Sequence, residues 1–265
     1  MSDPILFSVD AGLARLTLNR PASLNAFDGD LAHAWRERTA EAVARDDVQV
    51  ILIDAAGRSF CAGGDVLAMS KGMSGGEDIT AFAEVINDGI RSLTSSAVPV
   101  VAAAHGTTAG GGLGILMCSD YAVVGGRSKI GSLYANIGLT PDLSVSAQLA
   151  RAVGERRALQ LVLQDRMLTA EEAREWGLIA EVIEGPDAES EADAVRERAG
   201  QVARFWIEGA AGAYGQAKRL VRSQPSRTFA EQLAEEARSI GAAFDTAEAQ
   251  ARIAAFAAAS ARSPR

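Results

Sequence analysis

Two glycine-rich segments carry the clearest chemical signal in this chain of 265 residues. Residues 58–65 read R-S-F-C-A-G-G-D and residues 105–112 read H-G-T-T-A-G-G-G, and each follows a short aliphatic run that predicts a buried strand. Small residues let the backbone approach a ligand closely, and glycines where a helix begins leave N–H groups unpaired at the positive end of the helix dipole. Each segment is therefore a candidate anion site, although such a turn taken alone more often reflects tight packing.

One aspartate farther along the chain is a candidate for acid/base work. Asp142 ends the segment I-G-L-T-P-D at residues 137–142. An aspartate in an apolar pocket has a raised pKa, which suits moving a proton between two carbon atoms. The alternative is structural, because P-D-x-S before an apolar run is also the pattern of a helix N-cap. The residue pattern alone leaves both interpretations open.

The hydrophobic pattern predicts alternating strands and helices that would position these groups. The predicted strands cover residues 5–9, 13–18, 50–54, 100–104, 121–124, 129–130 and 180–183. The predicted helices cover residues 28–45 with Asp28 as N-cap, 79–93, a short apolar stretch after the third glycine, 144–153, 156–163 and 169–176. Residues 69–76 are rich in glycine and serine and are expected to be mobile.

This order of elements predicts an α/β core over residues 1–187 and a C-terminal helical segment over residues 188–265. The segment is expected to hold three Ala-rich amphipathic helices, broken at residues 209–212 and at Pro225. Helices that carry apolar stripes after a complete core often cover a neighbouring subunit.

Composition narrows the function classes. A net charge of −8 disfavours binding to nucleic acid, so any phosphate site must be local. The uncharged apolar stretches are shorter than the ~20 residues that cross a bilayer, and residues 1–10 are too polar for a signal peptide, so a cytoplasmic protein that binds no membrane is expected. Cys61 and Cys118 lie in apolar or glycine-rich surroundings without a CxxC pair, which predicts reduced structural thiols and no metal site.

The pairing of the two glycine-rich segments is more specific than either alone. F-C-A-G-G-D and, 47 positions later from Gly64 to Gly111, H-G-x-x-x-G-G-G resemble the two signature segments of the crotonase (enoyl-CoA hydratase/isomerase) superfamily. The match continues through S-D at residues 119–120, A-R-A-V-G at 150–154 and L-T-A-E-E-A at 168–173. The resemblance implies a crotonase-like spiral of ββα repeats, with a C-terminal helical segment that assembles a homotrimer or a dimer of trimers.

The resemblance also implies roles for particular residues. The N–H groups of Gly64 and Gly111 would form an oxyanion hole for the carbonyl of an acyl-CoA thioester. The backbone at Ser23, Leu24 and Ala62 would line the adenine and pantetheine path, and Asp65 would brace the loop. Coenzyme A would enter as part of the substrate, and no permanently bound cofactor is expected.

This chain departs from the hydratases of the family. The positions of their two catalytic glutamates are held here by Gly114 and Tyr134, neither of which is a carboxylate base. Asp142 occupies the place where other branches keep a working aspartate, and its motif is most similar to the phenylacetate-pathway isomerases. Those usually continue with two glycines, whereas Leu143 and Ser144 stand here. Tyr134 is expected mainly as an aromatic pocket wall, although its hydroxyl could donate a hydrogen bond.

The favoured hypothesis is an acyl-CoA isomerase that shifts a double bond, with Asp142 as acid/base. The alternatives are an enoyl-CoA hydratase using a non-standard acid, a hydrolase or dehalogenase in which Asp142 is the nucleophile, and a non-catalytic acyl-CoA-binding protein. An RNA-binding relative fits the acidic balance poorly. Lys218 and Arg219 are either solvated or contact the CoA phosphates, and His105 is expected to be a satisfied residue beside the glycine turn.

Overall fold

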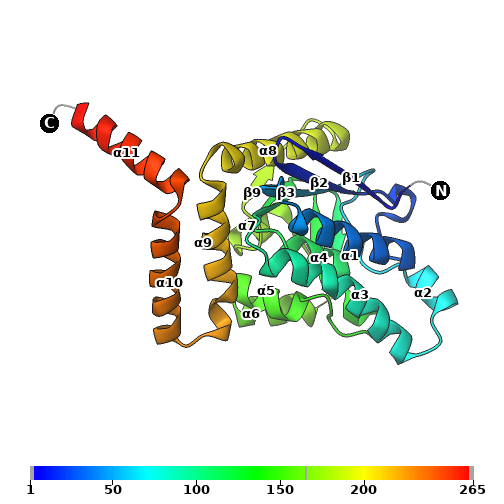
Figure 1. Cartoon of the computed structure of the whole chain (residues 1–265). Coiled ribbons are helices and arrows are strands. Elements are labelled where there is room, and N and C mark those ends of the chain that lie inside the picture. Colours follow the sequence, from blue (N-terminus) through cyan, green and yellow to red (C-terminus); the bar gives the residue numbers. More distant parts are fainter. Residues whose placement is uncertain (1–2, 165, 263–265) are drawn as a thin grey trace.

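The computed structural model describes residues 3–164 and 166–262, and in this part of the chain the strands form two sheets (Figure 1). The larger sheet has the order β1-β2-β3-β4-β6-β9 and is parallel except for the β1–β2 hairpin. Its strands are β1 (Ile5–Asp10), β2 (Leu13–Leu18), β3 (Val50–Ala55), β4 (Val100–Ala104), β6 (Tyr121–Gly125) and β9 (Glu181–Ile183). The smaller sheet consists of β5 (Thr107–Ala109), β7 (Lys129–Gly131) and β8 (Met167–Thr169).

Helices surround the sheets and form the C-terminal part of the chain. The first seven are α1 (Gly29–Ala44), α2 (Val66–Gly72), α3 (Gly76–Ser95), α4 (Gly111–Met117), α5 (Val145–Val153), α6 (Glu155–Val162) and α7 (Ala170–Glu175). The last four are α8 (Ala188–Glu208), α9 (Ala211–Ser223), α10 (Phe229–Phe244) and α11 (Ala247–Arg262). Short 3-10 turns occur at η1 (Pro21–Ser23), η2 (Tyr134–Ile137) and η3 (Gln224–Ser226).

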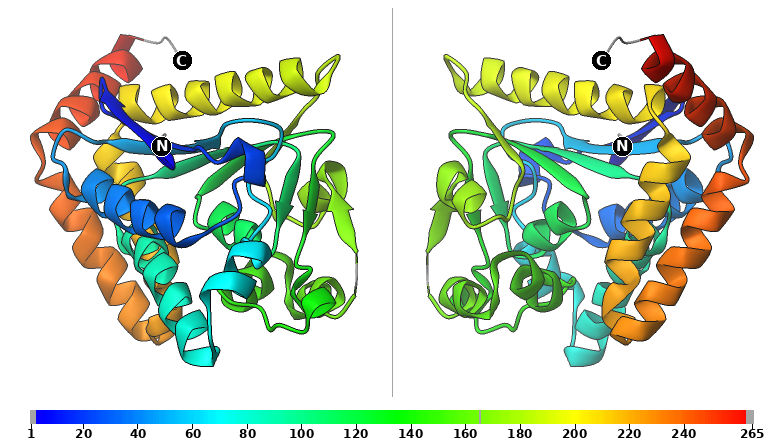
Figure 2. Two further views of the ribbon diagram at one scale, coloured as in Figure 1. Left: turned by 90° about the vertical axis from the view of Figure 1, so that its right-hand side faces the viewer. Right: turned by 90° about the vertical axis from the view of Figure 1, so that its left-hand side faces the viewer.

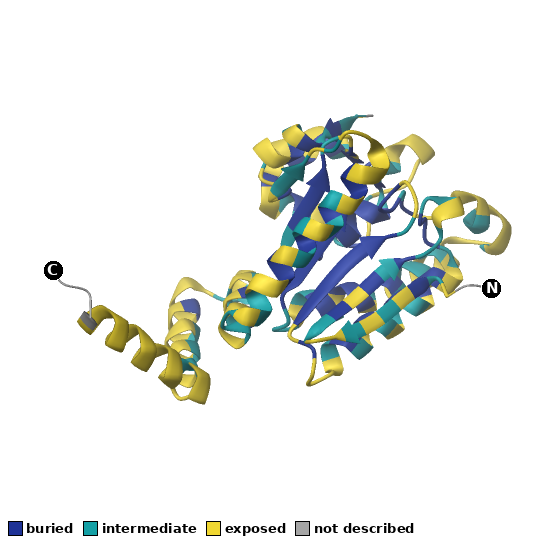
Figure 3. Ribbon diagram, turned by 90° about the horizontal axis from the view of Figure 1, so that it is seen from above, coloured by how far each residue is buried: buried dark blue, intermediate teal, exposed yellow. Residues whose placement is uncertain are grey.

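The central strands β3 and β4 of the larger sheet are buried throughout, which explains their mostly apolar sequences. In β3, Val50 and Leu52 face one cluster together with Val195 of α8, whereas Ile51 and Ile53 belong to the cluster on the opposite face. Helix α8 lies across one face in Figure 2, and Figure 3 shows the strands as the buried layer of the molecule. Because β3 and β4 are parallel neighbours, the loops that follow them leave from the same edge of the sheet.

Most predicted elements are confirmed within a residue or two. Asp28 caps α1, because its side chain accepts a hydrogen bond from the Leu31 N–H. Residues 69–72 lie inside α2, whose N-cap Asp65 accepts a hydrogen bond from the Ala68 N–H; the mobility expected for residues 69–76 stays a prediction. Strands β5 and β8 were not predicted, since β5 lies within the second glycine-rich segment and β8 ends in Thr169, the N-cap of α7.

The C-terminal segment also differs from its prediction. Residues 188–262 form four helices and not three, because the chain turns at Asp245 and Thr246, and the Thr246 hydroxyl accepts a hydrogen bond from the Ala249 N–H. Helix α8 packs on the sheet, whereas α10 and α11 extend away from it (Figure 1). A domain boundary after residue 187 stays a prediction. None of the helices in the described part of the chain is long and apolar enough to cross a bilayer.

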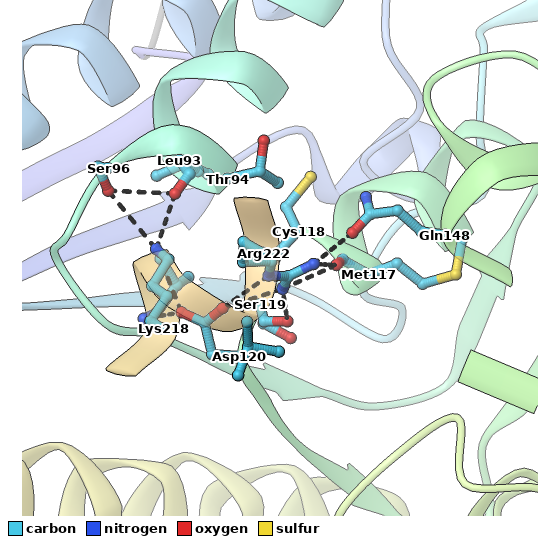
Figure 4. Close-up of polar contacts among 12 residues, drawn as sticks. Leu93, Thr94, Ser96, Met117, Cys118, Ser119, Asp120, Gln148, Lys218 and Arg222 are labelled. Atoms are coloured by element: carbon cyan, nitrogen blue, oxygen red, sulfur yellow. Dashed lines mark hydrogen bonds and ion pairs between the residues drawn. The ribbon is translucent and has the colours of Figure 1, made fainter. Parts of the chain in front are cut away.

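Helix α9 is fastened to the core by a buried cation (Figure 4). Lys218 is only 8% exposed, and its ammonium group donates to the carbonyl oxygens of Leu93 at 2.7 Å and Val98 at 2.6 Å. It also lies 3.2 Å from Oδ2 of Asp120. Arg222 forms an ion pair with Oδ1 of the same carboxylate at 2.9 Å. Burial lowers the pKa of Lys218, and the Asp120 charge opposes that effect.

The interpretation of Lys218 as a solvated side chain is therefore wrong, and its ammonium group is already occupied by protein acceptors. Arg219 also has a protein partner, the carboxylate of Glu235 on α10 at 2.7 Å.

Replacement of this buried cation should loosen the attachment of α9. We expect Lys218→Met to lower the free energy of unfolding by about 3 kcal/mol, because two buried carbonyl groups and one carboxylate oxygen of Asp120 lose their partner. Urea unfolding followed by circular dichroism measures the change. Lys71→Met, at an exposed position in α2, is the control and should leave the midpoint unchanged; equal midpoints for the two variants would contradict the assignment.

Candidate active site

The two glycine-rich segments meet at the edge of the sheet where β3 and β4 end. The Ala109 N–H donates to the Cys61 carbonyl at 3.0 Å, and the Cys61 N–H donates to the Thr107 carbonyl at 3.2 Å. Gly63 has a φ of +103°, and a Cβ atom on it would lie 3.0 Å from the Ala109 oxygen and 3.3 Å from the Gly111 nitrogen. Any side chain at Gly63 would push the segments apart, so glycine is required for this contact.

Gly64 and Gly111 have backbone N–H groups that donate to none of the described residues. The neighbours of Gly64 pair with Phe27, whose N–H donates to the Gly63 carbonyl and whose carbonyl accepts from the Asp65 N–H, so Gly64 itself is turned away from Phe27. Gly111 is the first residue of α4 and has no acceptor within the helix. Among the described residues, neither N–H group donates a hydrogen bond. The contact thus brings together two unpaired amide donors.

The loop before α1 packs against the first glycine-rich segment. The Ala62 N–H donates to the Leu24 carbonyl at 3.1 Å, and Ser23 directly precedes Leu24 at the end of η1. Buried Asn25 holds the loop, because its side-chain amide donates to the carbonyl oxygens of Ala56 and Ser59. The structure therefore brings Ser23, Leu24 and Ala62 together. Their predicted role in lining a ligand path stays a prediction.

Asp65 and α2 cover the other side of Gly64. Besides capping α2, the Asp65 carboxylate lies 3.2 Å from the guanidinium of Arg20, which also pairs with Asp28 at 2.7 Å. The cap fixes the start of α2, and a Cβ atom on Gly64 would lie 3.0 Å from the Met69 sulfur. The Met69 side chain of α2 therefore packs beside Gly64.

Asp142 has a defined side-chain partner. The Tyr134 hydroxyl donates to its Oδ1 at 2.6 Å. Asp142 is exposed as a whole residue, yet the protein around its carboxyl group partly desolvates it and raises its pKa, while the hydrogen bond from Tyr134 acts in the opposite direction. The N-cap interpretation of Asp142 is wrong, because the N-cap of α5 is Ser144 and no side chain caps that helix.

Leu143 connects Asp142 to the glycine contact. Leu143 and Ser144 both have a left-handed backbone, with φ of 47° and 67°, at the positions where the resembling isomerases have glycines. The Leu143 side chain is buried, and its Cδ1 lies 2.7 Å from where a Cβ on Gly111 would stand. A Cβ on Gly114 would overlap the Leu143 carbonyl oxygen. Asp142 is therefore joined directly to a residue that contacts Gly111 at the start of α4.

The histidines and cysteines have structural surroundings. His105 is buried, and its Nε2 must carry a proton, because it bonds the Gly57 carbonyl oxygen at 2.7 Å. Its Nδ1 has no partner among the described residues, so the expectation of a fully satisfied residue holds for one nitrogen only. Burial lowers the pKa of His105 and raises the pKa of Cys61 and Cys118 to about 12, which keeps both thiols protonated and unreactive.

One surface cavity lies away from this region, and a second cavity borders it. A cavity of about 690 Å³ lies between α9 and β6 and is lined by Trp206, Tyr214 and Lys218 but by none of Gly64, Gly111 and Asp142. A second one of about 410 Å³ has Ser144 in its wall, together with side chains of α3, α5 and α9. In a single chain, neither cavity encloses the amide donors.

Sequence reasoning gave too little weight to two residues of this region. The sequence predicts Tyr134 mainly as an aromatic wall of the pocket. Its separation of eight residues from Asp142 matches no recognisable period. Gly138 between them, with a φ of +74°, is the signal that could have indicated a returning turn. The contact of Leu143 with α4 had no sequence signal, because leucine seldom adopts a left-handed backbone.

Known proteins of one family resemble this chain over most of its length. The family model described as enoyl-CoA hydratase/isomerase matches residues 8–261. The 1,2-epoxyphenylacetyl-CoA isomerase of Escherichia coli is 32% identical over 239 residues, covering 88% of this chain and 87% of that protein. The trans-2-decenoyl-[acyl-carrier-protein] isomerase of Streptococcus mutans is 33% identical over 196 residues, covering 73% of this chain and 74% of that protein.

A solved structure described as an enoyl-CoA hydratase/isomerase from Mycobacterium abscessus superposes with a TM-score of 0.86 at 29% identity and covers 96% of both chains. The match of the family model extends from β1 to the last helix and includes both glycine-rich segments. The chain therefore belongs to the enoyl-CoA hydratase/isomerase (crotonase) family and has its fold.

Proposed function

We propose that this protein is an acyl-CoA isomerase that shifts a double bond in an unsaturated acyl-CoA thioester. The observation that carries the proposal is that Leu143, the residue after Asp142, packs against Gly111, whose N–H group, like that of Gly64, donates to none of the described residues. The similarity to two proteins named as isomerases, from Escherichia coli and Streptococcus mutans, supports the same reaction class.

In the proposed reaction, the thioester oxygen is bound by the N–H groups of Gly64 and Gly111. Removing a proton from the acyl chain places negative charge on this oxygen, and each preorganised donor contributes about 3 kcal/mol to stabilising that charge. Asp142 takes the proton from one carbon and returns it to another at the far end of the conjugated system. A raised pKa makes its carboxyl group a better base for this transfer.

Coenzyme A enters and leaves as part of the substrate in this proposal. Its path follows the backbone of Ser23, Leu24 and Ala62, and Asp65 braces the loop by its cap and its ion pair with Arg20. No separate cofactor takes part in the proton transfer. The cytoplasmic location expected from the sequence stays a prediction.

The second candidate is an enoyl-CoA hydratase that uses Asp142 in place of the two glutamates. The similarity to a protein of Rhodobacter capsulatus named a probable enoyl-CoA hydratase, 31% identical over 254 residues, favours it. The two-glutamate mechanism itself has no support at either position. The Leu143 carbonyl fills the space beside Gly114, and the Tyr134 hydroxyl donates a hydrogen bond to Asp142.

We also propose that the chain assembles as a homotrimer or a dimer of trimers through its last helices. Phe229, Leu233, Ile240 and Phe244 of α10 recur at helical spacing along one stripe. They stay exposed in the single chain, with Phe229 at 77% and Ile240 at 73%, while α10 packs on its own chain through other positions such as Gln232. A continuous apolar stripe of this kind is typical of a protein interface.

The role of Asp142 is tested by Asp142→Asn, which keeps the shape of the side chain and removes its basicity. We expect double-bond migration, followed by the ultraviolet absorbance of the conjugated thioester, to fall by at least ~1,000-fold, while binding of the CoA ester measured by calorimetry stays within a few-fold. Undiminished isomerisation would refute the assignment. Rapid loss of crotonyl-CoA absorbance in the wild type would favour the hydratase.

The crowding at Gly114 is tested by Gly114→Ala. We expect a loss of about 2 kcal/mol in the free energy of unfolding, because the new methyl group meets the backbone oxygen of Leu143. Gly241→Ala in α10 is the matched control: a Cβ there has no neighbour within 4 Å, and the change should stabilise the helix by about 0.5–1 kcal/mol. If Gly114→Ala stabilised the protein as the control does, the space beside α4 would be open and a glutamate could fit.

The assembly is tested by light scattering after size-exclusion chromatography. We expect the wild type to elute with the mass of three or six chains, and Phe229→Gln with Ile240→Gln to shift it toward a single chain, because polar groups replace the two most exposed residues of the stripe. Leu6→Gln, at an exposed apolar position on β1, should leave the mass unchanged. A monomeric wild type would contradict the proposal.

A further inference from the structure

We infer that Tyr134 is a positioning residue for Asp142: its hydroxyl group holds Oδ1, so that the carboxyl group exchanges the substrate proton through Oδ2 in a fixed orientation. The inference rests on the proposed function and adds to it a residue that has no part in the chemistry of proton transfer itself. It explains why an aspartate that is exposed as a whole residue can have one defined orientation. The contact that carries it is the 2.6 Å hydrogen bond from Tyr134 to Asp142.

A hydrogen bond of the surrounding turn and packing of the ring hold Tyr134 in place. Tyr134 begins the turn η2, between Leu133 with a φ of 53° and Gly138 with a φ of 74°. The Leu139 N–H donates to the Tyr134 carbonyl at 3.1 Å, which turns the chain back toward the tyrosine before Asp142 is reached. The Tyr134 ring is partly buried and packs against the main core. The hydroxyl is therefore a fixed donor, whereas Asp142 lies in a surface loop.

The hydroxyl group acts as a donor and not as an acid or base. Burial, and then the nearby Asp142 charge, raise the pKa of Tyr134 far above its ordinary value, so it keeps its proton through the whole neutral range. Among the described residues, Tyr134 is the titratable side chain that acts on Asp142, and the other group that acts on Tyr134 is Cys61, which is a neutral thiol at these pH values. The pH response of the pair should therefore be that of one carboxyl group.

The sign of the effect follows from which form the hydrogen bond favours. A phenol hydroxyl donates better to a carboxylate than to a carboxylic acid, so the bond lowers the pKa of Asp142, against the rise caused by desolvation. Without the hydroxyl group, the pKa of Asp142 should rise. Since proton abstraction requires the carboxylate, activity would then be lost at a higher pH as the solution is acidified.

The molecule offers a matched control for the removal of one hydroxyl group. Tyr121, on β6, donates its hydroxyl to Glu181 at 2.7 Å, nearly the same length as the bond to Asp142. Its partner Glu181 lies on β9 and is also bound by Arg198 at 2.7 Å. Tyr121→Phe therefore removes a similar hydrogen bond at a site outside the proposed chemistry.

The experiment measures kcat and kcat/KM for a 3-enoyl-CoA over pH 4–9 with the full chain and with Tyr134→Phe, Tyr121→Phe and Asp142→Asn. We expect Tyr134→Phe to lower kcat about tenfold, as the loss of ~1.4 kcal/mol of orientation would, with KM nearly unchanged and the acidic limb of kcat/KM moved to higher pH. Tyr121→Phe should match the wild type in both quantities. Circular dichroism at each pH shows whether Tyr134→Phe unfolds in acid, and a shifted pH midpoint is assigned to Asp142 only where the variant stays folded.

The variants separate the two levels of failure. An active Asp142→Asn would overturn the proposed function, and the inference with it. An inactive Asp142→Asn combined with a Tyr134→Phe whose kcat and acidic limb equal those of Tyr121→Phe would overturn the positioning role alone. A lower kcat with no shift of the acidic limb would also count against it, because a general packing defect lowers the rate without changing the basicity of Asp142.

Discussion

The arrangement of this protein depends on two backbones that approach within van der Waals distance without side chains between them. Adjacent parallel strands β3 and β4 deliver the loops that contain Gly63 and Gly111 to the same edge of the sheet, and short hydrogen bonds through Cys61 and Ala109 keep them there. A methyl group at Gly63 would press on the Ala109 oxygen and the Gly111 nitrogen, so the two loops could not keep this spacing. The apolar layers on both faces of the sheet keep the strand ends in register.

The segment after Asp142 shows how a locally unfavourable conformation can persist. A left-handed backbone costs a residue such as leucine roughly 1–2 kcal/mol, and Leu143 and Ser144 both adopt it. Burial of the Leu143 side chain against Gly111 offsets a cost of this size, since a buried leucine contributes about 2 kcal/mol. The same packing leaves no room for a side chain at Gly114, so the absence of a glutamate there and the presence of Leu143 are two parts of one arrangement.

The elements that were predictable from sequence have causes within a few residues of themselves. Asp28 caps the helix that directly follows it, and the apolar run of β3 reflects burial on both faces. The failures involve distant partners or unusual backbone. Lys218 looks like any basic residue on an amphipathic helix, and its acceptors lie about a hundred residues earlier in the chain. The hydrogen bond of Tyr134 to Asp142 depends on a turn whose geometry, with Leu133 in the left-handed region, no propensity indicates.

The attachment of α9 gives the C-terminal helices a mechanical connection to the amide donors. Arg222 donates to the carbonyl oxygens of Met117, Cys118 and Ser119, which end the short helix α4 and the turn after it. Helix α4 is a stiff rod only ~10 Å long, and its opposite end is Gly111. A displacement of α9 would therefore be transmitted through α4 to Gly111, so in the proposed assembly the packing of the last helices and the position of the proposed amide donor would be coupled.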